Sequence, residues 1–347
     1  MSNTQSREVQ AVLPLACPPC PYKILGRCDG PKDNKTYLMQ GRSVVGCLGA
    51  KRRGFYFGDT HEKFVPIPGS SHQHEITLPA FIPAIRDGLR VTWPEVLPSP
   101  LFAVALGKII NQSGNLAFET IDHLRQRFNL PQSGRICLIG TSKDYKLEAL
   151  WKISDREKIW ERIAHFGFEF VTSSTYSVWD KHPRFDQIRN QERNFQTHDI
   201  LANLGVPAIP FFFPVADSDY RAVFEWLQDR PDVNKVAVLA QFYKSPYLFA
   251  QFLKNMRAIE KTAQRQLEFL VVGVAQKYKI EAIRREFKAS IVCSKPFQAA
   301  LAGRRIKRTL EEEGPNLLLK RKDLVIPNIE QYVRCCERVR RQRVSAA

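Results

Sequence analysis

Apolar runs alternate with segments of helical pattern along most of the chain, and this alternation restricts the possible folds more than any other feature. The apolar runs are residues 78–85, 102–106, 135–139, 168–171, 208–213, 235–240, 267–274 and 290–293. The helical segments between them are residues 118–128, 155–166, 186–204, 219–228, 247–264 and 280–287. Strands that alternate with helices predict an α/β fold with a parallel sheet.

Several of these runs are continuously apolar, which is typical of strands that are buried on both faces. Eight such strands predict a barrel-like parallel sheet, a (β/α) barrel, with an open doubly wound sheet as the alternative. Gly167 and Gly205 stand just past two predicted helices, where we expect left-handed C-cap residues. Asp155 is the expected N-cap of the helix after it, and Asp217 or Ser218 that of the helix at 219–228.

We divide the chain into four parts by composition. Residues 1–57 form a cysteine-rich metal-binding segment, and residues 58–77 form a linker that contains Pro and Gly. Residues 78–302 form the α/β barrel-like domain, and residues 303–347 form a basic C-terminal tail that ends in a helix at 329–344. No run of about 18 apolar residues occurs, so we expect no membrane partner and a cytoplasmic protein.

Four cysteines near the N-terminus have the spacing C-x2-C-x7-C-x18-C; they are Cys17, Cys20, Cys28 and Cys47. A segment this short cannot bury a core of its own, so a bound metal would stabilise it. Only the first two cysteines form the close pair that is usual at zinc sites, whereas iron–sulfur clusters accept irregular spacing. The predicted cofactor is therefore a 4Fe-4S iron–sulfur cluster or zinc.

The chain has 52 Lys and Arg against 35 Asp and Glu, which gives a net charge of +17. A protein this basic usually has a polyanionic partner, and we expect nucleic acid, either DNA or RNA. Arg52 and Arg53 stand just before three aromatic residues. A second basic cluster consists of Arg304, Arg305, Lys307 and Arg308. Such residues bind phosphates without reading base sequence; the alternative is a solvated basic surface.

Polar side chains follow the predicted strands, where α/β folds bind their ligands. Asp144, after the third strand, is the candidate general base or nucleophile, and its alternative role is a helix N-cap or a solvated loop residue. Ser173, Ser174 and Tyr176 follow the fourth strand and would orient a substrate, with Tyr176 as a second catalytic candidate. Lys244, after the sixth strand, would hold a phosphate.

Gln187, Asn190 and Arg193 recur at intervals of three and so share one face of a predicted helix. A row of polar side chains that faces inward is costly unless its hydrogen bonds are satisfied. The row therefore either orders the loop before it or binds ligand, with Gln187 and Arg193 as candidate substrate- or phosphate-binding residues.

The region around this helix resembles the domain-of-unknown-function family number four-four-one-seven, which occurs in bacterial mobile elements. The positions that match its pattern are Tyr176-Ser177, Pro183, Gln187, Ile188, Asn190, Arg193 and Gly205-Val206-Pro207-Ala208-Ile209-Pro210. Ser174 and Thr175 stand where the family has a Pro-Asp pair. The resemblance covers the central region and implies an architecture and a mobile-element context.

We predict from these features a nucleic-acid-associated α/β-barrel protein with a four-cysteine metal site that modifies a base or nucleotide. In layout it is similar to the tRNA-guanine transglycosylases, which are barrels with a cysteine-bound metal that act on a base. The alternative is a non-catalytic DNA- or RNA-binding component of a mobile-element or defence system, which the scarcity of carboxylates favours. The sequence contains no P-loop, dinucleotide-binding, zinc-protease or serine-hydrolase motif.

Overall fold

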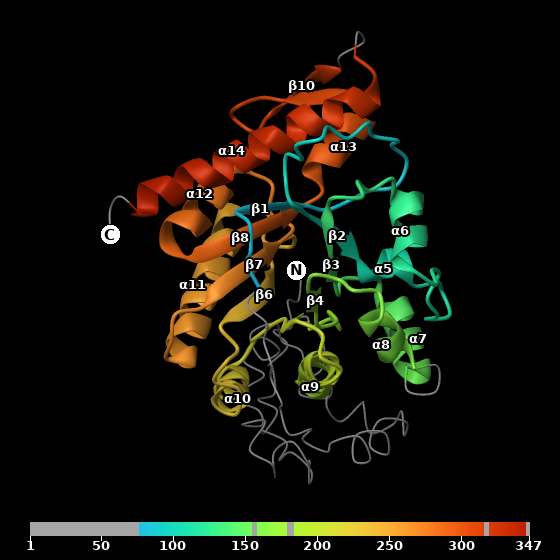
Figure 1. Ribbon diagram of the computed structural model, residues 1–347. Coiled ribbons are helices and arrows are strands. Elements are labelled where there is room, and N and C mark those ends of the chain that lie inside the picture. The colour runs from blue at the N-terminus through green and yellow to red at the C-terminus, as the bar shows by residue number, and fades with distance from the viewer. Residues whose placement is uncertain (1–75, 155–157, 179–183, 316–318, 345–347) are drawn as a thin grey trace, which may run out of the picture.

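The computed structural model describes residues 76–154, 158–178, 184–315 and 319–344 (Figure 1). Several residues of the sequence-based predictions lie outside this part of the chain. They are Cys17, Cys20, Cys28, Cys47, Arg52, Arg53, Asp155 and Pro183.

Two four-stranded parallel sheets form the centre of the molecule. The first has the order β1 (Phe81–Pro83), β8 (Lys288–Cys293), β7 (Glu268–Val272) and β6 (Lys235–Leu239). The second has the order β2 (Leu101–Ala105), β3 (Arg135–Ile139), β4 (Val171–Thr172) and β5 (Ala208–Ile209). The prediction of an α/β protein with parallel sheets is confirmed.

Isolated parallel bridges join the two sheets at both edges. Ala84, just after β1, pairs with Ala103 of β2, and Phe211, just after β5, pairs with Ala237 of β6. The backbone N–H of Phe212 donates to the carbonyl of Ala237 at 3.1 Å. Because every pairing among these eight strands is parallel, their carboxyl ends all lie at the same end of the molecule.

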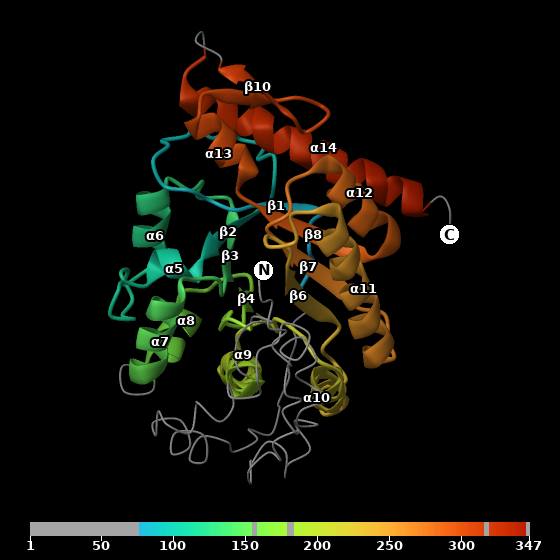
Figure 2. The same cartoon turned by 180° about the vertical axis from the view of Figure 1, so that it is seen from behind.

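Helices surround the strands (Figures 1 and 2). In Figure 1, α6, α7 and α8 lie on one side of the sheets, α11 and α12 on the other, and α9 and α10 below. Their bounds are α5 (Leu106–Ile109), α6 (Ile121–Phe128), α7 (Asp144–Ile153), α8 (Ile159–Ala164), α9 (Arg184–Asn203), α10 (Asp217–Gln228), α11 (Pro246–Ala263) and α12 (Lys277–Glu286). Of these, α7 and the short α5 were not predicted from the sequence.

The C-terminal part of the described chain is more structured than a tail. It contains α13 (Lys295–Leu301), an antiparallel hairpin of β9 (Arg304–Ile306) and β10 (Glu312–Pro315), a 3-10 turn η2 (Arg321–Leu324) and α14 (Val325–Val344). The predicted terminal helix is present and begins before residue 329. Tyr332 of α14 stacks on Phe81 of β1 with ring centres 5.0 Å apart, so this helix packs against the sheet.

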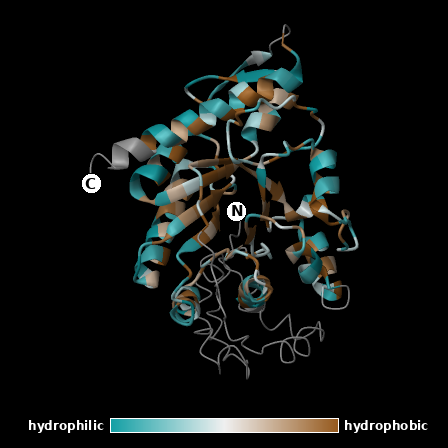
Figure 3. Ribbon diagram, in the orientation of Figure 1, coloured by the Kyte–Doolittle hydropathy of each residue, from teal (hydrophilic) through white to brown (hydrophobic). Residues whose placement is uncertain are grey.

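The apolar core lies on both faces of the strands, as their continuously apolar sequences predict. One cluster fills the space between strands and helices, and it contains Phe102, Leu138 and Val236. The other takes the alternate side chains of strands from both sheets, including Ala103 and Leu270. Figure 3 shows hydrophobic residues along the strands and hydrophilic ones on the outer helix faces.

Three of the four predicted helix ends can be compared with the structure. Gly167 and Gly205 have φ of 67° and 74°, so both take the left-handed conformation that was expected. The C-cap of α8 is nevertheless His165, which is right-handed and lies two residues before Gly167. The N-cap of α10 is Ala216, so the prediction of Asp217 or Ser218 is wrong by one or two residues. Asp219 is the third residue of α10, and its carboxylate accepts hydrogen bonds from the backbone N–H groups of Val215 and Ala216, at 2.8 Å each. This is the contact that the third helical residue makes back to the N-cap in a capping box.

Among the described helices, none is both long and apolar enough to cross a membrane.

Candidate functional site

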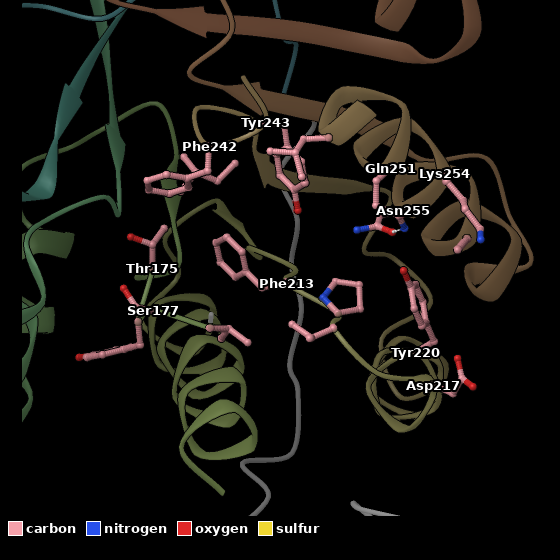
Figure 4. A pocket seen from close by; sticks show the side chains of 17 residues that line it. Thr175, Ser177, Phe213, Asp217, Tyr220, Phe242, Tyr243, Gln251, Lys254 and Asn255 are labelled. Atoms are coloured by element: carbon pink, nitrogen blue, oxygen red, sulfur yellow. Dashed lines mark hydrogen bonds between the residues drawn. The ribbon is translucent and has the colours of Figure 1, made fainter. Parts of the chain in front are cut away.

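A pocket of about 860 Å³ opens at the carboxyl ends of β4, β5 and β6 (Figure 4). Its walls come from the loops after these strands, from the start of α10 and from α11. The lining residues that carry polar or aromatic side chains are Thr175, Tyr176, Ser177, Phe213, Asp217, Tyr220, Phe242, Tyr243, Gln251, Lys254 and Asn255. Ligand sites of α/β proteins lie at this end of the strands.

Aromatic side chains dominate the strand side of the pocket. Phe213 follows β5, and Phe242 and Tyr243 follow β6. Phe242 is 43% exposed, so its ring is accessible from the open side of the pocket. Tyr220 of α10 also lines the pocket, and burial is the main cause that raises the pKa of its hydroxyl to about 12. This hydroxyl therefore stays protonated at neutral pH and can donate a hydrogen bond.

The polar wall of the pocket belongs to α11. Gln251 and Asn255 lie one turn apart on this helix, and the Gln251 amide donates to the Asn255 carbonyl oxygen at 2.8 Å (Figure 4). Lys254, between them in sequence, lines the same pocket. In Figure 4, Thr175 and Ser177 lie on the opposite side, at the end of β4. The pocket thus combines flat apolar surfaces with two amides, hydroxyls and one ammonium group.

The predicted catalytic carboxylate lies beside this pocket. Asp144 is the first residue of α7 and is exposed. Its Oδ1 accepts a hydrogen bond from the hydroxyl of Ser177 at 2.6 Å, and Ser177 lines the pocket. A carboxylate in contact with a serine hydroxyl can take up a proton from it or orient it towards a ligand. The loops after β3 and β4 bring these two residues together.

Helix α9 holds the loop that follows β4. The side chain of Asn194 accepts a hydrogen bond from the backbone N–H of Tyr176 at 2.9 Å and donates to the carbonyl of the same residue at 3.4 Å. Asn190 donates to the backbone carbonyl of Ser177 at 2.7 Å. Further along the wall, Gln191 donates to the carbonyl of Phe213 at 3.0 Å. One helix therefore fixes the backbone of two pocket loops.

Arg193 is a member of the same helix and is 3% exposed. Its guanidinium donates to both carboxylate oxygens of Glu148, at 2.7 and 3.1 Å, and to Asn190 Oδ1 at 3.1 Å. Its guanidinium carbon lies 3.7 Å from the centre of the Tyr176 ring and 4.7 Å from that of Trp151. These contacts join α7, α9 and the loop after β4; binding of phosphate by Arg193 stays a prediction.

The beginning of α9 is anchored to α10. Arg184 is buried and forms an ion pair with Asp219 and a hydrogen bond to Ser218 Oγ at 2.7 Å. Gln187 is also buried, and its Oε1 accepts a hydrogen bond from Arg184 at 3.2 Å. The predicted substrate-binding residue Gln187 thus lies within this anchor, outside the pocket lining.

The other predicted residues near the fourth strand are buried. Ser173 Oγ accepts a hydrogen bond from the backbone N–H of Phe211 at 2.8 Å, which ties the end of β4 to the residue after β5. Ser174 is 1% exposed. Tyr176 is 2% exposed, and burial raises the pKa of its hydroxyl, which donates to the carbonyl of Leu147 at 3.4 Å. Of these three, Tyr176 alone is in the lining of the pocket.

Lys244 is exposed and follows the pocket residue Tyr243. The ammonium group of Lys279, on α12, donates to the carbonyls of Tyr243 and Lys244 at 2.7 and 3.0 Å. Burial lowers the pKa of Lys279, which is 3% exposed. Lys279 therefore positions the aromatic loop after β6 from outside the pocket.

The predicted basic cluster of Arg304, Arg305, Lys307 and Arg308 lies on the hairpin of β9 and β10, and all four residues are exposed. In the described part of the chain, no group of three or more His, Cys, Asp or Glu side chains could hold a metal ion.

Sequence reasoning found the strand ends but missed the residues on α11. Lys254 and Asn255 follow Gln251 by three and four residues, so all three lie on one side of the helix, the same type of signal as the polar row on α9. The sequence gives no sign of which of the two polar helix faces borders a cavity. Asp217 begins α10 and Tyr243 follows β6, and both line the pocket.

No protein-family model matches the chain, and no curated protein matches its sequence.

Proposed function

We propose that this protein is a nucleic-acid-associated protein of barrel-like α/β fold that holds one base or nucleotide in the pocket at the ends of β4, β5 and β6. The observation that carries the proposal is the lining of this pocket, in which aromatic rings face two amides and a lysine. The net charge of +17 supports a polyanionic partner.

Each part of the lining suits one part of a nucleotide. Bases stack on aromatic rings, and Phe242 and Tyr243 offer such rings. The amides of Gln251 and Asn255 carry donors and acceptors that can pair with the edge of a base. Lys254 can neutralise a phosphate. The volume of about 860 Å³ lies within the range of roughly 300–1,000 Å³ that is usual for small-molecule sites.

The fold proposed for this site is a closed (β/α) barrel. Support comes from the bridges Ala84–Ala103 and Phe211–Ala237, which link the two sheets at both edges. Further support comes from the second buried cluster, whose members are contributed by strands of both sheets. In a barrel, the carboxyl ends of all strands surround one mouth, and the pocket would be part of that mouth.

We propose modification of the bound base or nucleotide as the activity, with Asp144 as the general base. Its hydrogen bond with Ser177 is the support, because Ser177 lines the pocket and would link the carboxylate to a ligand there. The non-catalytic alternative, a DNA- or RNA-binding component of a mobile-element or defence system, is favoured by one observation. Among the described residues that line the pocket, Asp217 is the only carboxylate.

Two further parts of the proposal rest on the sequence. Membership of the domain-of-unknown-function family rests on the motif between Tyr176 and Pro210. A metal bound by four cysteines rests on the spacing of Cys17, Cys20, Cys28 and Cys47. Neither is needed for the binding of a base in the pocket.

Calorimetric titration of the full chain with each of the four common nucleoside monophosphates tests the pocket. We expect at least one to bind, and Phe242→Ala to weaken it about 5- to 150-fold, since stacking on one aromatic side chain contributes about 1–3 kcal/mol per base. Tyr247→Ala is the matched control, because Tyr247 is an 80% exposed aromatic residue outside the lining. Absence of binding, or equal losses in the two variants, would refute the proposal.

Incubation with nucleic acid, digestion to nucleosides and mass analysis distinguish the two candidate functions. A mass change that the wild type produces and Asp144→Asn does not would establish the enzyme. If the wild type binds nucleotide and produces no change, the non-catalytic alternative holds. If Asp144→Asn retains full activity, another residue is the base.

A further inference from the structure

The hairpin of β9 and β10 carries a dense group of cations on a rigid support. Its turn is closed by two backbone hydrogen bonds, from Leu310 N–H to the Lys307 carbonyl and from Lys307 N–H to the Glu311 carbonyl, both 2.9 Å. Leu310 has φ of 64° and is buried, which fixes the turn. Asn328 of α14 accepts from the Ile306 N–H at 2.7 Å and donates to the Arg304 carbonyl at 3.1 Å. The strand is thus fastened to α14.

The pattern of burial directs the cations outward. Ile306 is buried, and Arg305 and Lys307 on either side of it are exposed, so both project from the opposite face of the strand. Arg308 follows in the turn. The exposed cations of the adjoining 3-10 region are Lys320, Arg321 and Lys322. We call these six residues the cationic hairpin surface; within the described residues, none of the six forms an ion pair.

The nearby carboxylates only partly balance this surface. Glu312 is occupied by ion pairs with Lys295 and Arg304. Glu311 accepts a hydrogen bond from the hydroxyl of Thr309 at 3.0 Å. Glu313 and Asp323 are the other acidic residues in this part of the chain. The six cations therefore outnumber the three carboxylates that remain.

The hairpin and the pocket lie at the same end of the strands. Lys295 comes two residues after Cys293, the carboxyl-terminal residue of β8, and its ion pair with Glu312 places β10 at that end. The pocket lies at the carboxyl ends of β4, β5 and β6. All eight strands are parallel, so the carboxyl end of β8 and those of β4, β5 and β6 lie at the same end of the molecule. In Figure 1 the hairpin is at the top and α9 and α10 are at the bottom, so a bound strand would cross the strand ends between them.

We propose that the cationic hairpin surface binds the phosphate backbone of a single-stranded polynucleotide whose base enters the pocket. This inference rests on the proposed function and extends it from a nucleotide to a polymer. A single strand fits because a base reaches an enclosed pocket only when it is unpaired. Phosphate contacts by Arg and Lys would position the strand, and the pocket would read the base.

The test compares a polymer with a monomer on the full-length chain. The probe is a fluorescent oligonucleotide of about 16 nucleotides, a length that spans one strand-binding module, made once as DNA and once as RNA. Arg305→Glu with Lys307→Glu should weaken oligonucleotide binding at least about 10-fold at low salt. The slope of log affinity against log salt should fall by about 1.4, which is about 0.7 for each phosphate that the variant no longer neutralises. The probe that binds more tightly shows whether the protein prefers DNA or RNA.

The matched control replaces two exposed cations away from the hairpin by glutamate, Arg127→Glu on α6 with Lys152→Glu on α7. It carries the same change of charge as the hairpin variant. A smaller loss of oligonucleotide affinity in the control would therefore show that the hairpin contacts the strand locally and does not act only through the overall charge of the protein. Both double variants should bind the mononucleotide as the wild type does, which also shows that they are folded.

If the hairpin variant loses no more oligonucleotide affinity than the control, the hairpin proposal is wrong, and mononucleotide binding still upholds the pocket. If no mononucleotide binds and the hairpin variant alone loses oligonucleotide affinity, the proposed pocket fails and the backbone contact stands. Equal affinity of wild type and hairpin variant for both polymers would likewise overturn the proposal.

Discussion

The guanidinium carbon of Arg193 lies 3.7 Å from the centre of the Tyr176 ring, while the same guanidinium forms two hydrogen bonds with Glu148. The residue that precedes Ser177 in the pocket wall is therefore held between a cation and the protein core. An arginine suits this position because its planar guanidinium can stack on an aromatic ring and bind a carboxylate through two hydrogen bonds at the same time.

Replacement of Arg193 by Gln should lower the free energy of unfolding by about 2–3 kcal/mol, because it removes both the hydrogen bonds to a charged partner and the stacking on two rings. Urea-induced unfolding measures the change. Arg162→Gln, at an exposed position of α8, should alter stability by less than about 0.5 kcal/mol. Equal effects at the two positions would show that the Arg193 interactions contribute nothing specific.

Gly140→Ala should destabilise the end of β3 strongly. A Cβ atom at this position would lie 2.0 Å from the backbone carbonyl oxygen of Ser173, a residue whose N–H donates to the Ile209 carbonyl at 2.9 Å. We expect a loss of about 3 kcal/mol or more, visible as a lower urea midpoint or as insoluble protein. Gly314→Ala is the control, because a Cβ there meets no atom within 4 Å. A fully stable Gly140→Ala protein would contradict this close approach.

Lowering the pH should break the ion pair between Glu312 of the hairpin and Lys295 of α13. Lys295 first, and then Arg304, hold the pKa of this carboxyl below its ordinary value. A depressed pKa means that the stabilisation is complete above the unfolded-state pKa and is lost as pH falls through the folded-state value. Wild type should exceed Glu312→Gln in stability by about 1 kcal/mol at neutral pH and lose that advantage progressively as the pH falls below the ordinary glutamate pKa of about 4.3. A constant difference across this range would show that the ion pairs do not couple to folding.

Lys279→Met should weaken nucleotide binding although Lys279 lies outside the pocket. The two backbone hydrogen bonds from Lys279 fix the loop of Tyr243, and their removal should reduce affinity about 5-fold, at about 1 kcal/mol. Lys277→Met is the control on the same helix, since Lys277 is only partly buried. If Lys279 only positions the loop, the Lys279→Met variant should also bind the oligonucleotide with the same dependence on salt as the wild type. An unchanged mononucleotide affinity would remove Lys279 from the site.

Metal analysis of protein purified without oxygen tests the four-cysteine prediction. A 4Fe-4S cluster should give brown absorbance and about four iron per chain, whereas zinc should give about one colourless ion. Cys20→Ser should lower the metal content in either case. Cys137→Ser, which changes a buried thiol of β3, separates loss of a ligand from general damage. Folded protein without either metal would refute the prediction.

The strands were predictable because the sequence has eight mainly apolar runs, several of them continuously apolar, a composition that is typical of strands covered on both faces. Helix α7 was not predicted because its start, with Lys143, Asp144 and Lys146, resembles a polar loop in the sequence. The hairpin escaped because β9 and β10 consist mostly of charged residues, which are uncommon in strands. In both cases tertiary contacts outweigh local propensity.

The site was predictable only in part. Strand ends lead directly to Asp144, Ser177 and Tyr243, because connectivity alone places them at one edge of the sheets. The position of Arg193 in a network of side chains, rather than in the pocket lining, depends on the direction of its side chain. That direction follows from packing against Trp151 and Tyr176, which no periodicity in the sequence shows.

Helices α9 and α11 have different roles at the pocket. Helix α9 holds loop backbones through Asn190, Gln191 and Asn194, whereas α11 presents Gln251, Lys254 and Asn255 to the cavity. Substitutions on α11 can therefore retune which ligand is preferred while the scaffold keeps its stability. Over evolutionary time such a separation lets one framework acquire new specificities, with the face of a single helix as the variable region.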